Sequence, residues 1–411
     1  MAWALYDWAN SAFATTVMAG FFPVFFKTIA SAGVASELST ARLGLVSSAG
    51  TLVVALLAPL LGAFADSGGF KKRFLGIAAF LGAIFTAGLA FVPAGYWQPA
   101  ILLYGAAAVV FAVSLCFYDS LLPFVATPKT MNRVSALGFA WGYFGGGLLF
   151  LVNVFMFQRP DWFGLASSEA ALRMSFITVG VWWGVFTLPL LFCVPEKRPV
   201  PRQPLRVYAS NALASLKQTL KDLRQLRQVL LFLAAFYFFN DGVGTIMKMA
   251  TDYGLSIGFG AKDLILALVI VQFIGFPATL AIGWLAERWR GKTLILICIG
   301  GYIGAVLWAT QMRRPAEFYG LAVIIGCIQG GIQALSRALY ARIIPADKTA
   351  EFFGFYNLMG KFSGLLGPTL VGLVGYTLGN ARWGIASILL LFLIGGSILF
   401  CVKDPEERLA S

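Results

Sequence analysis

Long apolar runs alternate with short polar stretches along almost the whole 411-residue chain. A membrane-spanning helix needs about 20 mainly apolar residues, and twelve segments reach that length. With approximate limits, they are residues 4–30, 40–65, 73–93, 98–122, 133–157, 171–194, 228–253, 262–286, 292–311, 316–343, 351–378 and 382–402. The first segment has no basic residue before Lys27, so we expect a retained span and not a cleaved signal peptide. The pattern predicts an all-α polytopic membrane protein with twelve transmembrane helices.

The longest polar stretch lies in the middle of the chain and carries eight basic residues, more than any other loop. It separates six predicted spans from six more. We therefore expect an N-terminal six-helix bundle over residues 1–194, a cytoplasmic basic linker over 195–227, and a C-terminal six-helix bundle over 228–411.

Composition agrees with this reading and excludes several kinds of chemistry. Hydrophobic residues make up 59% of the chain and charged residues only 12%, against about 25% charged in a typical soluble domain. There is no histidine, so a Ser-His-Asp triad and a histidine-ligated metal are excluded. The five cysteines are far apart and no GxxxxGK[ST] phosphate loop is present. We expect no enzyme activity, no metal and no cofactor.

The basic residues are distributed unevenly between the two sets of loops. Loops on the side of the linker and both termini hold 21 Lys and Arg residues, and the opposite loops hold 8. This bias places the linker and both termini in the cytoplasm. The net charge of +13 is therefore a topology signal, and we expect no nucleic-acid partner.

A short motif recurs in the two halves of the chain. Gly62 and Asp66 lie between the second and third spans, followed by basic residues that include Arg73. Gly283 and Glu287 lie between the eighth and ninth spans, and both pairs are offset by 221 residues. Glycine lets two helices approach, and the acid can cap a helix N-terminus or pair with a basic residue. We expect a gating role for Asp66, Arg73 and Glu287.

Ionisable residues within spans are costly and usually face a cavity or a partner. Asp7 lies near the start of span one, with Asn10 one turn on. We expect Asp7 either to complement the helix dipole or to serve in gating or proton exchange. In span seven, Asn240 and Asp241 precede Lys248, which shares a helical face with Asp241. Asp241 could bind a proton or a substrate amine, and Lys248 could bind a substrate carboxylate. The alternative is that both form neutralising ion pairs with charged residues of other helices. The adjacent glycines predict local unwinding of this span.

Two polar stripes follow in later spans. Gln329, Gln333 and Arg337 recur every four residues in span ten, and Asn357 and Lys361 do so in span eleven. Each stripe either lines a water-filled cavity or makes hydrogen bonds between helices. Asp119, near the end of span four, maps close to Arg337 through the 221-residue offset, so we expect an Asp119–Arg337 pair that closes the cytoplasmic side. Gly138, Gly142 and Gly146 predict close helix crossing in span five.

Several strings resemble one family of transporters. The loop motif is similar to that of the major facilitator superfamily, G-x-x-x-D-x-x-G-R-[RK], with Glu287 in place of Asp in the second copy. Strings from Trp3 to Pro368 resemble its UMF1 (Atg22-like) branch, and the compact length resembles a bacterial member. They are WALYDWANSAF (from Trp3), FYDSLLP (from Phe117), GFAWGYFGG (from Gly138), NDGVGTI (from Asn240), GGIQALSR (from Gly330) and EFFGFY (from Glu351). The resemblance implies the major facilitator fold and transport, with amino acids as one substrate class.

These observations predict a secondary active transporter that moves a small solute by alternating access. Lys248, Lys361, Asn357, Gln329, Gln333, Asn10 and Asn240 are the expected substrate-binding residues, and Asp241 and Asp7 the proton-coupling ones. The solute is amino-acid-like or an organic anion, and the coupling ion is H⁺ in preference to Na⁺. Alternatives are a non-transporting membrane receptor or scaffold, and a lipid or amphiphile transporter with a laterally open apolar cavity. We expect a monomer in the lipid bilayer of the bacterial plasma (inner) membrane.

Overall fold

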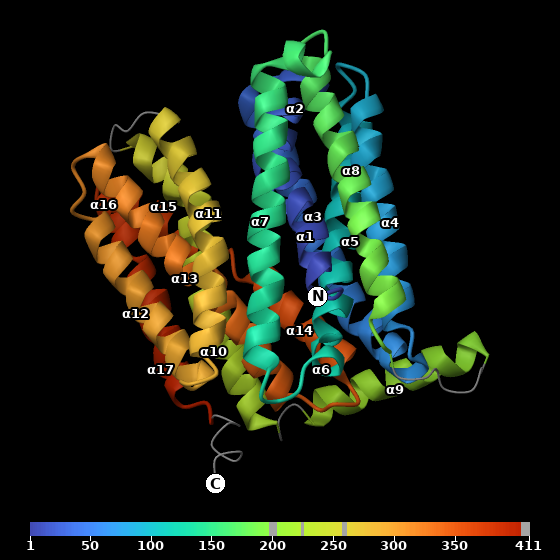
Figure 1. Ribbon diagram of the computed structural model, residues 1–411. Helices are drawn as coiled ribbons and strands as arrows, with labels where there is room; N and C mark the ends of the chain where they lie inside the picture. Colours follow the sequence, from blue (N-terminus) through green and yellow to red (C-terminus); the bar gives the residue numbers. More distant parts are fainter. Residues whose placement is uncertain (197–203, 223–225, 257–260, 404–411) are drawn as a thin grey trace. The chain divides into compact units, whose positions relative to one another are not determined.

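The computed structural model describes residues 1–196, 204–222, 226–256 and 261–403, in which all regular secondary structure is helical (Figure 1). Eleven helices in these ranges are long and apolar enough to cross a membrane, and each overlaps one predicted span. The twelfth predicted span, 262–286, corresponds to α11 (Ala261–Leu285), which contributes the shorter apolar helix Val269–Leu285. The prediction of an all-helical polytopic membrane protein is confirmed.

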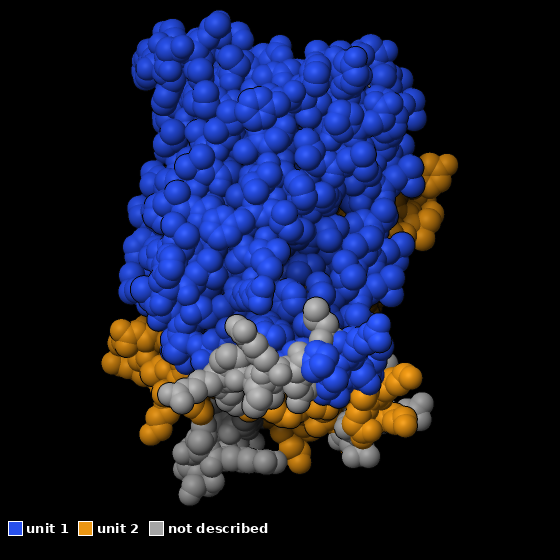
Figure 2. Space-filling model, turned by 90° about the vertical axis from the view of Figure 1, so that its right-hand side faces the viewer, with its two compact units in different colours: residues 1–125, 141–213, 350–354 blue, residues 126–140, 214–349, 355–411 orange. Residues whose placement is uncertain are grey.

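The chain forms two compact units, which Figure 2 shows in different colours. The first unit contains Met1–Val125, Trp141–Leu213 and Ala350–Gly354, and the second contains Ala126–Ala140, Ala214–Thr349 and Phe355–Ser411. Three helices therefore contribute residues to both units: α7 (Met131–Gln158), α9 (Leu205–Asp222) and α14 (Thr349–Phe362). The three-part division at residues 194 and 227 stays a prediction.

The remaining helices belong to one unit each. Those of the first unit are α1 (Ala4–Ala12), η1 (Phe13–Phe21), α2 (Phe22–Phe25), η2 (Phe26–Ala30), α3 (Ser36–Gly68), α4 (Lys71–Gly88), η3 (Leu89–Phe91), α5 (Trp97–Ser120), α6 (Leu122–Val125), η4 (Pro160–Phe163) and α8 (Ser168–Cys193). Those of the second unit are α10 (Arg227–Ser256), α11, α12 (Gly291–Ala309), α13 (Pro315–Ile343), α15 (Leu366–Thr377), α16 (Ala381–Ala386) and α17 (Ile388–Phe400).

Side chains that would be buried in a soluble protein point outward in both units. Leu56 on α3, Phe192 on α8 and Phe400 on α17 are each more than 70% exposed. Exposed surface of this kind is unfavourable in water but costs nothing against lipid chains. The exposed apolar side chains therefore agree with helices that lie in a bilayer.

Span 4–30 changes its helical type along its length. Two stretches of this span are π-helical, Phe13–Phe21 and Phe26–Ala30. Pro23 is the second residue of the α-helical turn between them. Proline has no N–H to donate and so interrupts the regular hydrogen-bond ladder. Stretches of π-helix are rare and often occur at functional sites.

Glycines let α7 pack directly on α1 within the first unit. A side-chain carbon added at Gly142 would lie 2.7 Å from the Ser11 hydroxyl, and one at Gly146 would lie 3.1 Å from the Ser11 backbone. Gly145 makes similar room for the Trp8 ring. The predicted close crossing of the span-five glycines is confirmed at Gly142 and Gly146.

Candidate functional site

The eleventh predicted span is not one helix. α14 ends at Phe362 and α15 begins at Leu366, with Ser363 and Leu365 outside the regular helix. Pro368 lies in the first turn of α15, where its missing N–H costs nothing. In a continuous helix the ring of Pro368 would clash with the carbonyl of Gly364, four residues earlier. This break creates a free helix N-terminus in the middle of an apolar span.

The carboxylate of Asp241, on α10, lies at that N-terminus and is completely buried. Its two oxygens accept the backbone N–H groups of Leu366 at 3.0 Å and Gly367 at 3.1 Å. The Thr245 hydroxyl, one turn along α10, donates to the same carboxylate at 3.2 Å. A helix N-terminus carries about half a positive charge, so it stabilises the charged form of Asp241. Asp241 thus caps α15 from another helix.

The glycines around this site serve packing. A side-chain carbon at Gly367 would collide with the Thr245 hydroxyl and lie 2.8 Å from the Asp241 carboxylate, so only glycine lets the acid approach. Gly242 instead makes room for the Phe392 ring on α17, at 2.8 Å. The unwinding predicted for span seven is wrong: α10 runs without a break from Arg227 to Ser256, and the break lies on the facing helix.

Lysine ammonium groups lie beside the same break. A side-chain carbon at Gly364 would lie 2.6 Å from the Lys248 Nζ, which places this ammonium at the residue that interrupts the helix. Lys361, half-buried, lies on the last turn of α14, and the Asn240 side chain donates to the Ser363 hydroxyl. Asn357 is half-buried one turn before Lys361. In the second unit, Asn240, Asp241 and Lys248 of α10 therefore lie at the break between α14 and α15.

The predicted stripe on α13 divides into two environments. Gln329 is buried, and its side-chain oxygen has no hydrogen-bond partner among the described residues. Gln333 is half-buried. The Arg337 guanidinium is buried, donates to the hydroxyl and carbonyl oxygens of Ser135 at 2.9 Å each, and lies 4.2 Å from the Phe139 ring centre. Arg337 therefore binds the start of α7 within the second unit.

The first unit has its own buried acid. Asp7 on α1 is 5% exposed and accepts the Tyr118 hydroxyl at 2.9 Å. The Tyr118 ring stacks on Trp3 at 4.3 Å, which fixes the position of this donor. Asn10, one turn beyond Asp7, is 2% exposed, and its side-chain nitrogen has no partner among the described residues. Tyr118 was not identified from the sequence, although it immediately precedes the singled-out Asp119.

Asp66 binds the first turn of α14, which belongs to the same unit. Its carboxylate accepts the backbone N–H groups of Ala350 at 3.2 Å and Glu351 at 2.8 Å, and it pairs with the Lys71 ammonium at 2.7 Å. Gly62 lies directly against the Ala350 carbonyl. Asp66 thus both caps a helix and forms an ion pair. Arg73 is exposed.

The second copy of the motif packs against α7 in the second unit. Gly283 leaves room for the Ala136 side chain, as Gly62 does for Ala350. Glu287 is exposed and pairs with Arg133 at 3.6 Å. Asp119 is buried at the end of α5 in the first unit, so the Asp119–Arg337 pair stays a prediction.

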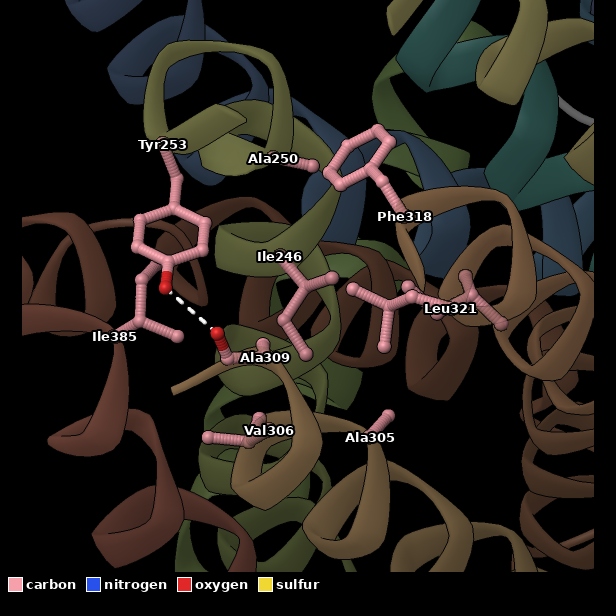
Figure 3. Close-up of a pocket in the computed structure, with 10 residues that line it drawn as sticks. Ile246, Ala250, Tyr253, Ala305, Val306, Ala309, Phe318, Leu321 and Ile385 are labelled. Carbon is pink, nitrogen blue, oxygen red and sulfur yellow. Dashed lines mark hydrogen bonds between the residues drawn. The ribbon is translucent and has the colours of Figure 1, made fainter. Parts of the chain in front are cut away.

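Two apolar hollows lie outside these polar sites. In the second unit, a cavity of about 30 Å³ is lined by Ile246, Tyr253 and Phe318 among other side chains, and the Tyr253 hydroxyl donates to the Ala309 carbonyl at 2.7 Å (Figure 3). It is too small for an amino acid. In the first unit, an open groove of about 380 Å³ is lined by Leu149, Trp182 and Phe186 among others. Neither is lined by a charged side chain.

Comparison with known proteins places these sites in a family context. The model of the family "Vacuole effluxer Atg22 like" matches residues 39–408. The chain is 39% identical over 408 residues to the "Uncharacterized MFS-type transporter YxiO" of Bacillus subtilis, covering 98% of this chain and 94% of that protein. It is 27% identical over 305 residues to "Autophagy-related protein 22" of Yarrowia lipolytica, with 67% of this chain and 51% of that protein covered. The chain thus spans about half the length of that fungal relative.

Solved structures give the same fold at low sequence identity. The fold is similar to that of the proton:xylose symporter XylE, with a TM-score of 0.70, 16% identity, and 98% of this chain and 94% of that chain covered. It is also similar to FucP in its outward conformation, with a TM-score of 0.75, 11% identity, and 98% of both chains covered. The all-helical fold is therefore that of the major facilitator superfamily.

Proposed function

Because this chain belongs to the Atg22-like family of major facilitator superfamily transporters, we propose that it is a secondary active transporter of a small amino-acid-like solute or organic anion. Transport proceeds by alternating access and is coupled to protons. The observation that carries this proposal is the buried Asp241 carboxylate on the N-terminus of α15, with the Lys248 ammonium beside the same break.

A broken helix supplies what an anionic solute needs within a membrane. Half-helix N-termini in transporters face anionic groups of substrates, and here that position is occupied by the protein's own carboxylate. Lys248 beside Gly364 and Lys361 on the last turn of α14 add positive charge near the break. A solute carboxylate that approaches the lysines competes with Asp241 for the N–H groups of Leu366 and Gly367.

Protonation of Asp241 decides that competition. A neutral carboxylic acid has lost its charge and is a weaker acceptor for the helix terminus. The terminus then favours the solute carboxylate, so a proton and an anionic solute are bound together. Asp7, held by Tyr118 in the first unit, is the second proton-coupling residue. Asn10, Asn240, Gln329, Gln333 and Asn357 supply neutral hydrogen bonds to the solute.

The gate is formed by the two loop motifs. Asp66 holds the first turn of α14 through two N–H groups, and Glu287 pairs with Arg133 near the start of α7. Breaking these contacts releases the starts of both helices, and an Asp119–Arg337 pair forms when the cytoplasmic side closes. The excess of Lys and Arg on one side supports cytoplasmic termini in the bacterial plasma membrane. We propose a monomer.

Reconstitution in liposomes tests the proposal. Purified protein is screened with amino acids and organic anions under imposed proton and sodium gradients, beside Asp241→Asn and Lys248→Ala variants. A proton gradient should drive accumulation by the wild type but not by Asp241→Asn, and Lys248→Ala should raise the KM for the solute. Uptake that no gradient affects would overturn the coupling proposal. An unchanged biological role in both variants would instead favour a receptor or scaffold.

A second candidate function is movement of a lipid or another amphiphile. It is favoured by the open apolar groove of about 380 Å³ beside Trp182, Val185 and Phe186. The same liposomes distinguish it when they contain a fluorescent phospholipid analogue. Movement of the analogue that is abolished by Val185→Trp, with no uptake of water-soluble solutes, would replace the first proposal.

A further inference from the structure

One side of α11 is exposed from Leu266 to the end of the helix, although its residues are apolar. The exposed residues lie at intervals of seven, four, four and three, and they are Leu266, Phe273, Pro277, Ala281 and Trp284. Other sides of α11 are packed within the second unit, where Ile274 lies against Gly326 of α13 and Gly283 against Ala136 of α7. An exposed apolar stripe along a membrane span is covered by lipid chains.

Trp284 is the last residue of this stripe and lies at the end of the span. The helix α11 ends at Leu285, and the charged residues Glu287 and Arg288 follow within three positions. The Trp284 side chain is 50% exposed. Tryptophan rings at the ends of spans lie at the level of the lipid headgroups. The exposed ring of Trp284 therefore marks the depth at which the lipid-covered stripe meets the headgroups.

The guanidinium of Arg288 lies over this ring, 4.2 Å from its centre. Arg288 is exposed, and no ion pair among the described residues involves it. The neighbouring charges have other partners: Glu287 pairs with Arg133 at 3.6 Å, and the Lys292 ammonium donates to backbone carbonyls at the end of α17. Stacking occupies one face of the guanidinium and leaves its N–H edge for an anion, and a guanidinium binds phosphate through two parallel hydrogen bonds.

We propose that Trp284 and Arg288 bind the headgroup of an anionic phospholipid. The Arg288 guanidinium binds the lipid phosphate, and the Trp284 ring contacts the glycerol and the first part of an acyl chain. Glu287 is already balanced by Arg133, and the exposed Arg290 adds positive charge, so an anionic headgroup is favoured over a zwitterionic one. The apolar stripe below the ring favours a lipid over free phosphate, because a small anion gains nothing from it.

Hydrogen exchange of the full-length protein in nanodiscs tests this site. The discs contain phosphatidylcholine with increasing fractions of phosphatidylglycerol, and peptides that cover residues 285–292 should exchange more slowly as phosphatidylglycerol increases. One basic residue near an anionic surface changes the affinity about fivefold, so Arg288→Gln should raise the half-saturating fraction about fivefold. Trp284→Leu, which keeps an apolar side chain but removes the ring, should raise it about two- to fivefold. No transported solute is needed, so the result is independent of the proposed transport.

Two matched variants separate this site from general effects of charge and aromatic rings. Arg313→Gln removes an exposed cation that lies beyond the other end of α12, and Trp289→Leu removes a ring that is 51% exposed but is not the one under Arg288. Both should keep the wild-type half-saturating fraction.

Three results would overturn the proposal. The first is a wild-type half-saturating fraction in Arg288→Gln. The second is an equal increase in either matched variant. The third is protection of residues 285–292 by inorganic phosphate in pure phosphatidylcholine discs to the same extent as by phosphatidylglycerol, which would assign Arg288 to a free anion.

Discussion

Replacing Asp241 should expose the start of α15, and the effect can be measured without knowing the transported solute. Asp241→Ala removes the acceptor of the Leu366 and Gly367 N–H groups, which are hydrogen-bonded to the carboxylate at 3.0 and 3.1 Å. The carboxylate is fully buried, so its removal leaves both N–H groups without their protein acceptor. Asp241→Asn keeps one acceptor oxygen but loses the charge.

The size of the effect follows from those two bonds. A hydrogen bond to a charged acceptor contributes about 1.5–3 kcal/mol, so losing both costs about 3 kcal/mol or more. A tenfold change in an equilibrium requires about 1.4 kcal/mol. The amides of Leu366 and Gly367 should therefore exchange with solvent about 100-fold faster in Asp241→Ala than in the wild type. In Asp241→Asn one bond remains as a neutral one and the other N–H loses its acceptor, so exchange should lie between the wild-type and Asp241→Ala rates.

Hydrogen-exchange mass spectrometry of peptides that cover residues 363–370 measures this difference in detergent micelles. Asp7→Asn is the matched control, because it removes a buried carboxylate from the first unit and leaves α15 alone. Its exchange at Leu366 and Gly367 should equal that of the wild type. If these amides exchange at the wild-type rate in Asp241→Ala, Asp241 does not cap α15 and the proposed competition with a solute carboxylate fails.

Three further substitutions test the glycine positions and the gate. Gly364→Ala should raise the KM for the solute with little change in maximal rate, because the new methyl group displaces the Lys248 ammonium, which lies 2.6 Å from its position. An unchanged KM would count against Lys248 as a ligand of the solute. Gly62→Ala should destabilise the protein by about 1–3 kcal/mol, seen as a lower unfolding temperature, since its methyl group meets α14 backbone; Gly44→Ala, which points into open space, is the control. Asp119→Arg and Arg337→Asp should each abolish transport and together restore it, and no recovery in the double variant would exclude the pair.

Much of the fold could be predicted from hydrophobic runs alone. A span needs only length and apolar composition, so eleven predicted segments coincide with helices long enough to cross a membrane. The repeated glycines were equally informative, because Gly62 and Gly283 do touch another helix in the two units. Patterns of this kind depend on the local chain and on one neighbour, which the sequence encodes directly.

The break in span eleven shows where glycine content misled the sequence reading. Gly242 and Gly244 suggested unwinding of α10, but a glycine in a helix also serves packing, and Gly242 receives the Phe392 ring. Pro368 was the stronger signal for a break in span eleven, because in a continuous helix its ring would clash with the carbonyl of Gly364. Asp241 accepts the N–H groups that this break leaves without a partner in their own helix. Predicting this contact requires knowing that α10 faces the break, which neither segment shows by its own sequence.

The helix α9 was also missed within the predicted linker. The basic residues and prolines of this segment indicated a polar linker, and the helical period of Tyr208, Ala212 and Thr219 is the signal that indicates α9. A similar limit applies to α7 and α14, each of which contributes residues to both units. The sequence predicts where each span begins. The unit to which the first turns of α7 and α14 belong depends on how they pack against Gly283 and Gly62.

The hydrogen bonds of Asp241 also limit which solutes suit the proposed site. Two buried N–H groups left without an acceptor cost about 1–3 kcal/mol each, so the carboxylate can leave α15 only if another acceptor replaces it. A solute that carries only an amine has no such acceptor, and a hydroxyl is a weak, uncharged one. A carboxylate supplies two charged oxygens and pairs with Lys248 as it enters. The capping role of Asp241 is therefore compatible with its proposed role in proton coupling, and together they favour a carboxylate-bearing solute.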